Sequence, residues 1–313
     1  MPDIETVKGP LAISIVASKA FDCLYMADIY RQISDDTGLD FRTITDFLDR
    51  MPIFLNGAAH KTQRATLAAR LAQRVPAIDA ELGQKIDQIA EEIRHRDGSF
   101  DVLQELGHPI WQAVSRAILA HRLDDMPDLT DLPLVLSPYT PLLKRVSIEA
   151  RLRMLVEAHG ADILDELTLV TLGAGPIING FALSVHDLVT RHAGYRLDQI
   201  TYPAQFPKSA LRFVHRIATT DQVIADTKIP SGARKCCVIF DESYPADQNT
   251  RNLYGVGAHT CLGRRVAMQS WTGLCRALSQ IPNVVQPGPL RVQSREPFDT
   301  VSECQIHLTP SQT

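Results

Sequence analysis

The sequence has few aromatic residues, few cysteines and no strong excess of charge. Aromatic side chains make up 6% of its 313 residues, so a site built by stacking large planar substrates is not indicated. The six cysteines are scattered, which suggests reduced thiols in the cytoplasm rather than a disulfide framework. No pair has the spacing of zinc ligands: the only two cysteines close together in the sequence, Cys236 and Cys237, are adjacent. A net charge of −4 gives no sign of a nucleic-acid or anionic-membrane partner.

Targeting and membrane segments are also lacking. The first five residues contain neither a basic stretch nor an apolar core, so we expect no signal peptide. We expect no membrane span either, since charges or prolines interrupt each apolar run before it reaches membrane-spanning length. With 45% hydrophobic residues, the chain can bury a large core. We interpret residues 1–313 as a single domain, helix-rich over 1–215 and mixed over 216–313.

Hydrophobic periodicity predicts mainly helices. Apolar residues at steps of three and four predict amphipathic helices over 78–93 and 103–118, the second with a kink at Pro109. A long helical stretch is predicted over 147–186, with an interruption near Gly160. The fold class that these patterns indicate is mainly α.

A small β region is predicted in the last third of the chain. Residues 236–240 read as a strand that follows a turn at 230–232, and a second pair of strands is predicted at 290–292 and 301–308. Four prolines between residues 124 and 146 predict a loop there.

The most informative segment is Tyr-Gly-Val-Gly-Ala-His-Thr-Cys-Leu-Gly, residues 254–263. Its glycines permit positive φ and a close approach of the backbone to a flat ligand. Apolar residues at helical spacing follow, so Cys261 is predicted at the first turn of a helix. Free amides and the positive dipole end at that position favour a thiolate, which is an axial ligand of haem iron. Without its surroundings, the cysteine would be interpreted as a small buried hydrophobic residue.

This segment resembles the haem-binding loop of the cytochrome P450 superfamily, Phe-Gly-x-Gly-x-His/Arg-x-Cys-x-Gly, with Tyr254 at the aromatic position. The resemblance implies a reduced cytochrome P450-like fold, mainly α with a small β region, that forms one haem-thiolate domain. It implies haem b as the cofactor, with Cys261 as the ligand of the iron. The other cofactor contacts that it implies in this loop are Tyr254, Gly255, Gly257, His259 and Gly263.

Two other segments extend the resemblance to the haem propionates. His60 and Arg64 lie four residues apart, on one helical face, and resemble the His-x-x-x-Arg pair that grips a propionate. Arg64 can do so in a bidentate manner. Arg216 resembles the strand arginine that grips the haem, and His259 adds a further contact. Taken alone, these side chains would be interpreted as solvated basic residues.

One departure from the family is the absence of the glutamate of its Glu-x-x-Arg ion pair. Family members carry Glu-x-x-Arg on a helix, whereas Ser209 precedes Arg212 here. The glutamate normally pairs with the helix arginine and with a second arginine in the loop before the haem motif. Its loss is predicted to cost about 3–5 kcal/mol unless the arginine finds another partner or turns to solvent. Candidate partners are Asp241, Glu242 and Asp247.

A second departure concerns residues 172–180, Leu-Gly-Ala-Gly-Pro-Ile-Ile-Asn-Gly, which resemble the stretch of helix across the oxygen-binding face of the haem. Glycines and a proline predict a kink or bulge there. This kink has either a purely structural role or a role in the site. Two isoleucines replace the acid and alcohol that deliver protons to dioxygen in the family. The candidate distal residues are Gly175, Pro176, Ile177, Ile178 and Asn179, the last being the nearest polar group.

The chain is also shorter than usual family members. The N-terminal sheet region, the roof of the substrate pocket at 123–146 and the loop at 243–252 all look reduced. A thin roof implies an open pocket, or one that a partner chain or oligomer completes.

Three functions are compatible with these features. The first is P450-type monooxygenation of a small-molecule substrate, with electrons from a ferredoxin-type donor on the Cys261 face. A basic patch for an acidic donor would comprise Lys61, Arg64, Arg70, Arg74, Arg264 and Arg265. The second is a peroxide-dependent oxidation or a rearrangement at the haem, which the missing proton-delivery pair favours. The third is a non-catalytic haem-binding sensor or assembly partner, which the missing glutamate and thin roof favour.

Overall fold

The computed structural model describes residues 4–120, 129, 131–137, 139–295 and 298–310. The helices are α1 (Gly9–Ala17), α2 (Met26–Thr37), α3 (Arg42–Leu48), α4 (Gly57–His95), α5 (His108–Leu119), α6 (Leu142–His159), α7 (Ile163–Arg191), α8 (Ala246–Asn252) and α9 (Arg264–Leu278). The strands are β1 (Glu5–Val7), β2 (Phe21–Asp22), β3 (Gly98–Asp101), β4 (Phe213–Ala218), β5 (Gln222–Ile224), β6 (Thr227–Ile229), β7 (Arg234–Val238), β8 (Val284–Arg295) and β9 (Phe298–Thr309).

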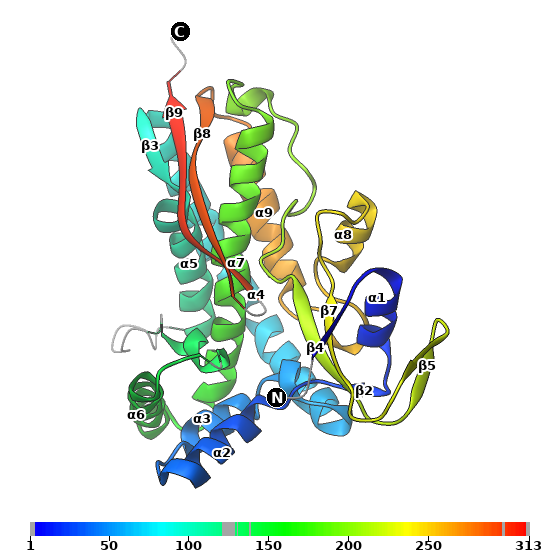
Figure 1. Ribbon diagram of the computed structural model, residues 1–313. Helices are drawn as coiled ribbons and strands as arrows, with labels where there is room; N and C mark the ends of the chain where they lie inside the picture. Colours follow the sequence, from blue (N-terminus) through cyan, green and yellow to red (C-terminus); the bar gives the residue numbers. More distant parts are fainter. Residues whose placement is uncertain (1–3, 121–128, 130, 138, 296–297, 311–313) are drawn as a thin grey trace.

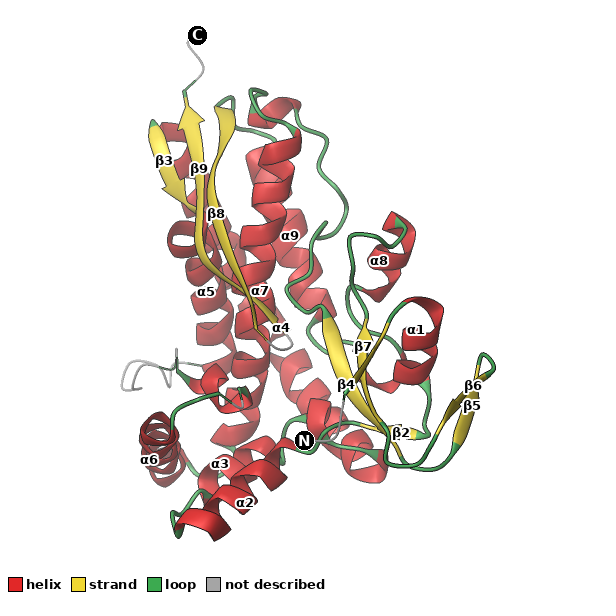
Figure 2. Ribbon diagram, in the orientation of Figure 1, coloured by secondary structure: helices red, strands yellow, loops and turns green. Residues whose placement is uncertain are grey.

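The long helices α4, α5, α7 and α9 pack together, and a three-stranded sheet in the order β3-β9-β8 lies against them (Figure 1). A four-stranded sheet in the order β1-β7-β4-β2 forms a second, smaller part together with α1 and the β5–β6 hairpin (Figure 2). Each part has its own cluster of buried apolar side chains. The fold is therefore mainly α with small sheets, as predicted, although β1, β2 and β3 lie in the helix-rich first 215 residues.

Helix α4 joins two segments that the sequence pattern treats separately. It extends over 39 residues, so His60 and the apolar stripe of residues 78–93 belong to one helix. Pro76 lies inside it, and the cost of the lost backbone bond, about 3 kcal/mol, is offset by burial on both sides. Asn283 closes the C-terminal end by donating to the carbonyl oxygens of Ile93 and Arg96 at 3.0 and 3.2 Å.

Helix α7 is the central helix and is packed by α5, β8 and β9. The predicted interruption before it is confirmed, because Gly160 ends α6 with a positive φ of 78°. By length and composition alone, α7 is apolar enough to cross a membrane, contrary to the expectation that prolines break every such run. Pro176 is accommodated within the helix, and 56% of the most apolar 18-residue stretch of α7 is buried inside the protein.

Two predicted irregular regions are more helical than expected. A π-helical turn, Leu103–Gly107, directly precedes α5, so the distortion lies just before Pro109 rather than at it. Within the predicted loop at 124–146, the structure has a short 3-10 helix, Leu132–Leu136, and the first turn of α6. Residues 121–128, 130 and 138 of that region lie outside the described residues.

The β region is larger than the sequence pattern predicts. Strands β8 and β9 form an antiparallel pair of twelve residues each, and the predicted segments 290–292 and 301–308 lie within them. A register shift follows Pro287, where Gly288 is needed because a Cβ would lie 2.7 Å from the Gln305 carbonyl oxygen. The turn before β7 is confirmed, with Gly232 at a φ of 78°.

Candidate functional site

The segment before α9 forms a tight loop that places Cys261 at the start of the helix. Its ends are joined by a hydrogen bond from the Cys261 amide to the Tyr254 carbonyl oxygen at 2.7 Å. Gly255 and Gly257 adopt φ values of 73° and 68°, a region that costs other residues about 1–2 kcal/mol. A Cβ on Gly257 would also lie 3.1 Å from the Cα of Ala17 in α1. The backbone of the loop therefore requires these two glycines.

The Cys261 thiol lies beside the backbone amides at the N-terminal end of α9. Burial raises the pKa of the thiol, while hydrogen bonding from the amide of Gly263, the charge of Arg64 and the amide of Arg264 lower it. The residue is solvent-accessible, yet enough protein atoms surround the sulfur to desolvate a thiolate. A positive ion bound to the sulfur would reverse that balance, because it stabilises the thiolate directly.

Four basic side chains from three distant segments meet next to this loop. The rings of His60 and His259 lie 4.3 Å apart, centroid to centroid. Burial, followed by the charges of Arg216, His60 and Arg64 in that order, lowers the pKa of His259 to about 3. Burial, followed by the charge of Arg64, lowers the pKa of His60 as well. The cluster therefore disfavours any additional positive charge.

An anionic group would satisfy this cluster. The Nε2 atom of His60 is buried and has no hydrogen-bond partner among the described residues. Arg216 is buried and donates to the His215 carbonyl oxygen at 2.8 Å. Among the described residues, no carboxylate forms an ion pair with Arg64 or Arg216, which is unusual for buried or half-buried guanidinium groups. The structure thus brings together the four residues that the sequence assigns to propionate binding.

Cys23 belongs to the same cluster, although nothing in the sequence pattern indicates it. Its Sγ lies 3.4 Å from Nε2 of His259, and its amide donates to Oδ1 of Asn56 at 3.0 Å. Asn56 directly precedes α4, so this bond ties the segment after β2 to the helix that carries His60. Burial raises the pKa of the Cys23 thiol, so it lies in the cluster as a neutral group.

Tyr254 fills the aromatic position of the loop. The guanidinium of Arg264 lies over its ring, 5.4 Å from the centroid. Within the part of the chain that the structure describes, its hydroxyl is buried without a hydrogen-bond partner, and burial raises its pKa to about 12. The ring packs against α9 while its polar end is available to a further group.

The candidate distal residues of α7 divide into packed and accessible ones. Ile177 is buried, and Ile178 packs so closely on the π-helical turn before α5 that a Cβ on Gly107 would lie 3.0 Å from the Ile178 carbonyl oxygen. Pro176 is exposed, and a Cβ on Gly175 would meet no atom within 4 Å. These two are the candidate residues that leave open space on the helix.

Asn179 has a structural role. Its Nδ2 donates to the Gly175 carbonyl oxygen at 3.0 Å, and its Oδ1 accepts the amide of Val301 at 2.9 Å. Both ends of the side chain are thus occupied in fastening β9 to α7. Between Glu166 and Asp187 the only ionisable side chain in the sequence is that of His186, whose Nε2 lies 3.0 Å from the Gly288 carbonyl oxygen. Residues 167–185 of α7 therefore contain no ionisable proton donor in place of the missing pair.

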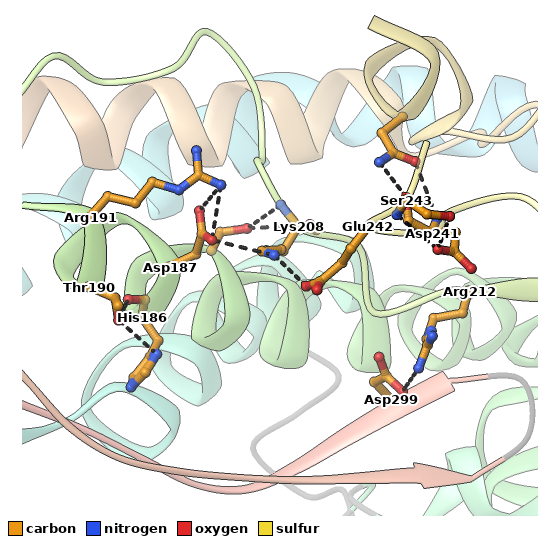
Figure 3. A network of polar contacts seen from close by, with 12 residues as sticks. His186, Asp187, Thr190, Arg191, Lys208, Arg212, Asp241, Glu242, Ser243 and Asp299 are labelled. Atoms are coloured by element: carbon orange, nitrogen blue, oxygen red, sulfur yellow. Dashed lines mark hydrogen bonds and ion pairs between the residues drawn. The ribbon is translucent and has the colours of Figure 1, made fainter. Parts of the chain in front are cut away.

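The three candidate partners of Arg212 and the helix implied at 209–212 are wrong, whereas the expectation that the arginine finds another partner or turns to solvent is confirmed. Residues 209–212 are not helical, and the arginine pairs with Asp299, Nη1 to Oδ1 at 3.7 Å (Figure 3). Its side chain is 43% exposed, so the cost of a buried unpaired charge does not arise. The three proposed partners pair elsewhere: Asp241 with Lys8, Glu242 with Lys208 and Asp247 with Arg251.

Half of the predicted basic patch is neutralised within the chain. Arg70 pairs with Asp165 at 3.1 Å and Arg74 with Glu166 at 3.6 Å, and Arg265 lies 3.7 Å from Asp79. In the part of the chain that the structure describes, the members without an ion pair are Lys61, Arg64 and Arg264.

Comparison with solved structures identifies the architecture. CalO2 matches with a TM-score of 0.70 and 14% identity, over 96% of this chain and 89% of that chain. The chain has a cytochrome P450 fold. P450 RauA, complexed with a biosynthetic intermediate of aurachin RE, matches with a TM-score of 0.66 and 16% identity, over 95% and 89%. The versatile cytochrome P450 CYP109B1 from Bacillus subtilis matches with a TM-score of 0.64 and 13% identity, over 96% and 92%. Neither the protein-family models nor the curated protein sequences include a match.

The residues of this P450 fold fit a haem group. The cluster of His60, Arg64, Arg216 and His259 suits two carboxylates, and His60 supplies an unused buried nitrogen. Cys261 supplies one sulfur for an axial position. Among the described residues, no group of three or more His, Cys, Asp or Glu side chains is arranged to hold a bare metal ion. A metal within a larger anionic cofactor matches this combination.

Proposed function

We propose that this protein is a haem-thiolate oxidoreductase in which Cys261 is the axial ligand of the iron. One observation supports this most directly. The cysteine at the N-terminal end of α9 lies beside a cluster of cationic and histidine side chains that lacks an acidic partner among the described residues. A thiolate ligand and two propionates are the negative groups that such a site would neutralise.

The chain's own residues would hold the haem from one side and one edge. Arg64 and Arg216 would bind the propionates, and His60 would donate from the nitrogen that is otherwise unpaired. The amides of Gly263 and Arg264 would stabilise the thiolate, and the glycine loop would let the backbone lie against the ring. When bound, the haem supplies redox chemistry at an iron made electron-rich by the thiolate.

Oxidation of a small organic substrate with electrons from a redox partner is the first candidate reaction. Lys61, Arg64 and Arg264 have no ion pair among the described residues, and they would offer positive charge to an acidic ferredoxin-type donor near Cys261. This is a smaller patch than the six residues of the sequence pattern. Free thiols at all six cysteines accord with our proposal that the protein works in the cytoplasm.

A peroxide-dependent oxidation or a rearrangement at the haem is the second candidate, and a specific observation favours it. The middle of α7 holds no acid, and Asn179 is committed to hydrogen bonds with Gly175 and Val301. A reaction in which the oxidant brings its own electrons and protons needs no relay from this helix.

A non-catalytic haem-binding role is the third candidate. That a partner chain or oligomer covers the pocket roof remains a prediction. Near the roof, Tyr139 and Leu143 are 71% and 86% exposed. Among the solved structures of this fold, P450BioI is in complex with an acyl carrier protein ligated to hexadec-9Z-enoic acid, so a protein of this fold can bind a carrier protein.

Reconstitution with haem tests the ligand assignment. The reduced carbon-monoxide complex of the wild type should show the absorption band of a thiolate-ligated haem, and Cys261→Ala should lose that band. Cys236→Ala, on β7, is the matched control and should retain it. A wild type without the thiolate band would refute the axial role of Cys261.

Substrate oxidation under two conditions separates the reactions. Product formed with reduced ferredoxin and dioxygen supports the first candidate, and its rate should fall with added salt because salt screens the donor contact. Product formed with peroxide alone supports the second. Failure under both conditions across a broad substrate screen would leave the third.

A further inference from the structure

Residues 200–212 form the last part of the connection between α7 and β4, and the family resemblance implies a helix at residues 209–212. The connection is held by apolar contacts to two long helices. The ring of Phe206 lies 4.9 Å, centroid to centroid, from the rings of Phe181 on α7 and Trp271 on α9. Trp271 Nε1 also donates to the Pro203 carbonyl oxygen at 2.8 Å. The segment is thus fixed between α7 and the helix that begins after the cysteine loop.

Lys208 is the point where this segment carries charge. Its amide and carbonyl both bond to the hydroxyl of Ser184, each at 3.3 Å. Its Nζ lies 2.6 Å from Oε1 of Glu242 and 3.4 Å from Oδ1 of Asp187 (Figure 3). Asp187 is held in turn by Arg191 at 3.0 Å. One ammonium group therefore joins a carboxylate on α7 to a carboxylate on the loop after β7.

Glu242 lies in a turn that is held by hydrogen bonds between its neighbours. The neighbouring Asp241 accepts the amide of Ser243 at 2.9 Å and its hydroxyl at 2.7 Å. The backbone of Asp241 also exchanges two hydrogen bonds with the side chain of Asn249 in α8. The two hydrogen bonds from Ser243, followed by Lys8, hold the pKa of Asp241 below its usual range. Because Glu242 directly follows Asp241, an ion pair that fixes Glu242 also helps to fix the position of α8. Helix α8 leads directly into the cysteine loop.

We propose that Lys208 is a positioning residue that fastens the segment before the Cys261 loop to α7, in the place of the glutamate missing at Ser209. The importance of that position for haem binding rests on the proposed function. The charge order is reversed relative to the family's arrangement, with one cation between two carboxylates instead of one carboxylate between two arginines. Lys208 and Asp187 are 24% and 15% exposed, whereas Glu242 is 80% exposed, so the fastening is weak and sensitive to salt.

Hydrogen exchange on the haem-free chain tests the fastening directly. Lys208→Met should raise the exchange rates of amides in residues 239–255 by about three- to ten-fold, the effect of losing two partly exposed ion pairs. Lys208→Arg should restore protection, because it keeps the charge between Asp187 and Glu242. Lys228→Met on the β5–β6 hairpin is the matched control and should leave these rates unchanged.

The haem-loaded chain gives a second, spectroscopic result. We expect Lys208→Met to lower the fraction of the reduced carbon-monoxide complex with the thiolate-type band, and Lys208→Arg to recover it. If Lys208→Met matches Lys228→Met in both measurements while the wild type has the band, the proposal is wrong. If the wild type lacks the band, the axial assignment fails, and the exchange rates still decide the role of Lys208.

Discussion

Replacing Gly257 with alanine should destabilise the haem-free protein by more than its left-handed backbone alone explains. Gly257 lies in the cysteine loop with a φ of 68°, and Gly232 lies in the turn before β7 with a φ of 78°. The two residues therefore impose the same conformational demand. They differ in surroundings, because a Cβ on Gly232 would meet nothing within 4 Å, whereas one on Gly257 would lie 3.1 Å from the Cα of Ala17.

The expected magnitudes follow from this difference. An alanine in the left-handed region costs about 1–2 kcal/mol, so this is the expected loss for Gly232→Ala. Gly257→Ala adds a steric conflict with backbone, which no side-chain rotation relieves, and overpacking of this kind costs about 1–3 kcal/mol. We therefore expect a loss of about 2–5 kcal/mol for Gly257→Ala.

Urea unfolding of the two haem-free variants and the wild type measures the free energies of unfolding. The informative quantity is the difference between the variants, because it isolates the contact between the loop and α1. Equal losses for Gly257→Ala and Gly232→Ala would refute the reasoning. That result would mean that the contact with Ala17 relaxes freely and that Gly257 serves only the bound cofactor.

Three further predictions concern stability and the haem site. Asp165→Asn should cost about 2–4 kcal/mol in urea unfolding, since it removes a buried carboxylate from Arg50 and Arg70, which are 28% and 30% exposed; Asp162→Asn, 78% exposed, is the control and should cost under about 1 kcal/mol. Because burial holds the pKa of His60 below its ordinary 6.5, the unfolded chain takes up the proton first on acidification. Stability of the haem-free chain should therefore fall as pH drops below about 6.5, and His60→Leu should reduce the fall in denaturation midpoint; an unchanged fall would contradict burial of a neutral His60. Asn179→Ala should cost about 1–3 kcal/mol, because the buried amide of Val301 loses its acceptor, yet it should keep the thiolate-type band; loss of the band without loss of stability would argue for a role in the site instead.

The helices and the cysteine loop were predictable because their signals are local. Apolar residues at helical spacing predict residues 78–93 of α4 and most of α5 and α7, and the pattern of residues 254–263 predicts a cysteine at a helix start. The helix across Pro76 was not predictable in the same way. Its continuity depends on packing along the whole of α4, which outweighs the local penalty of a proline.

The partners of the charged and polar residues were not predictable from spacing. Arg212 pairs with Asp299, 87 positions further along the chain, and Asn179 bonds to Val301 on β9. Cys23 reaches His259 only because β2 pairs with β4 and brings the N-terminal segment to the cysteine loop. Each contact joins segments that the sheet topology, rather than any motif, places together.

The sequence by itself determined the chemistry of one position, a thiol among glycines at the N-terminal end of a helix, because φ preferences and helix amides act within a few residues of Cys261. Tertiary structure alone decided which charges meet there. The meeting of His60, Arg64, Arg216 and His259, and the placing of Lys208 between two carboxylates, depend on the packing of α4, α7 and β4. Electrostatic effects act through space, so they are set by that packing and not by order along the chain.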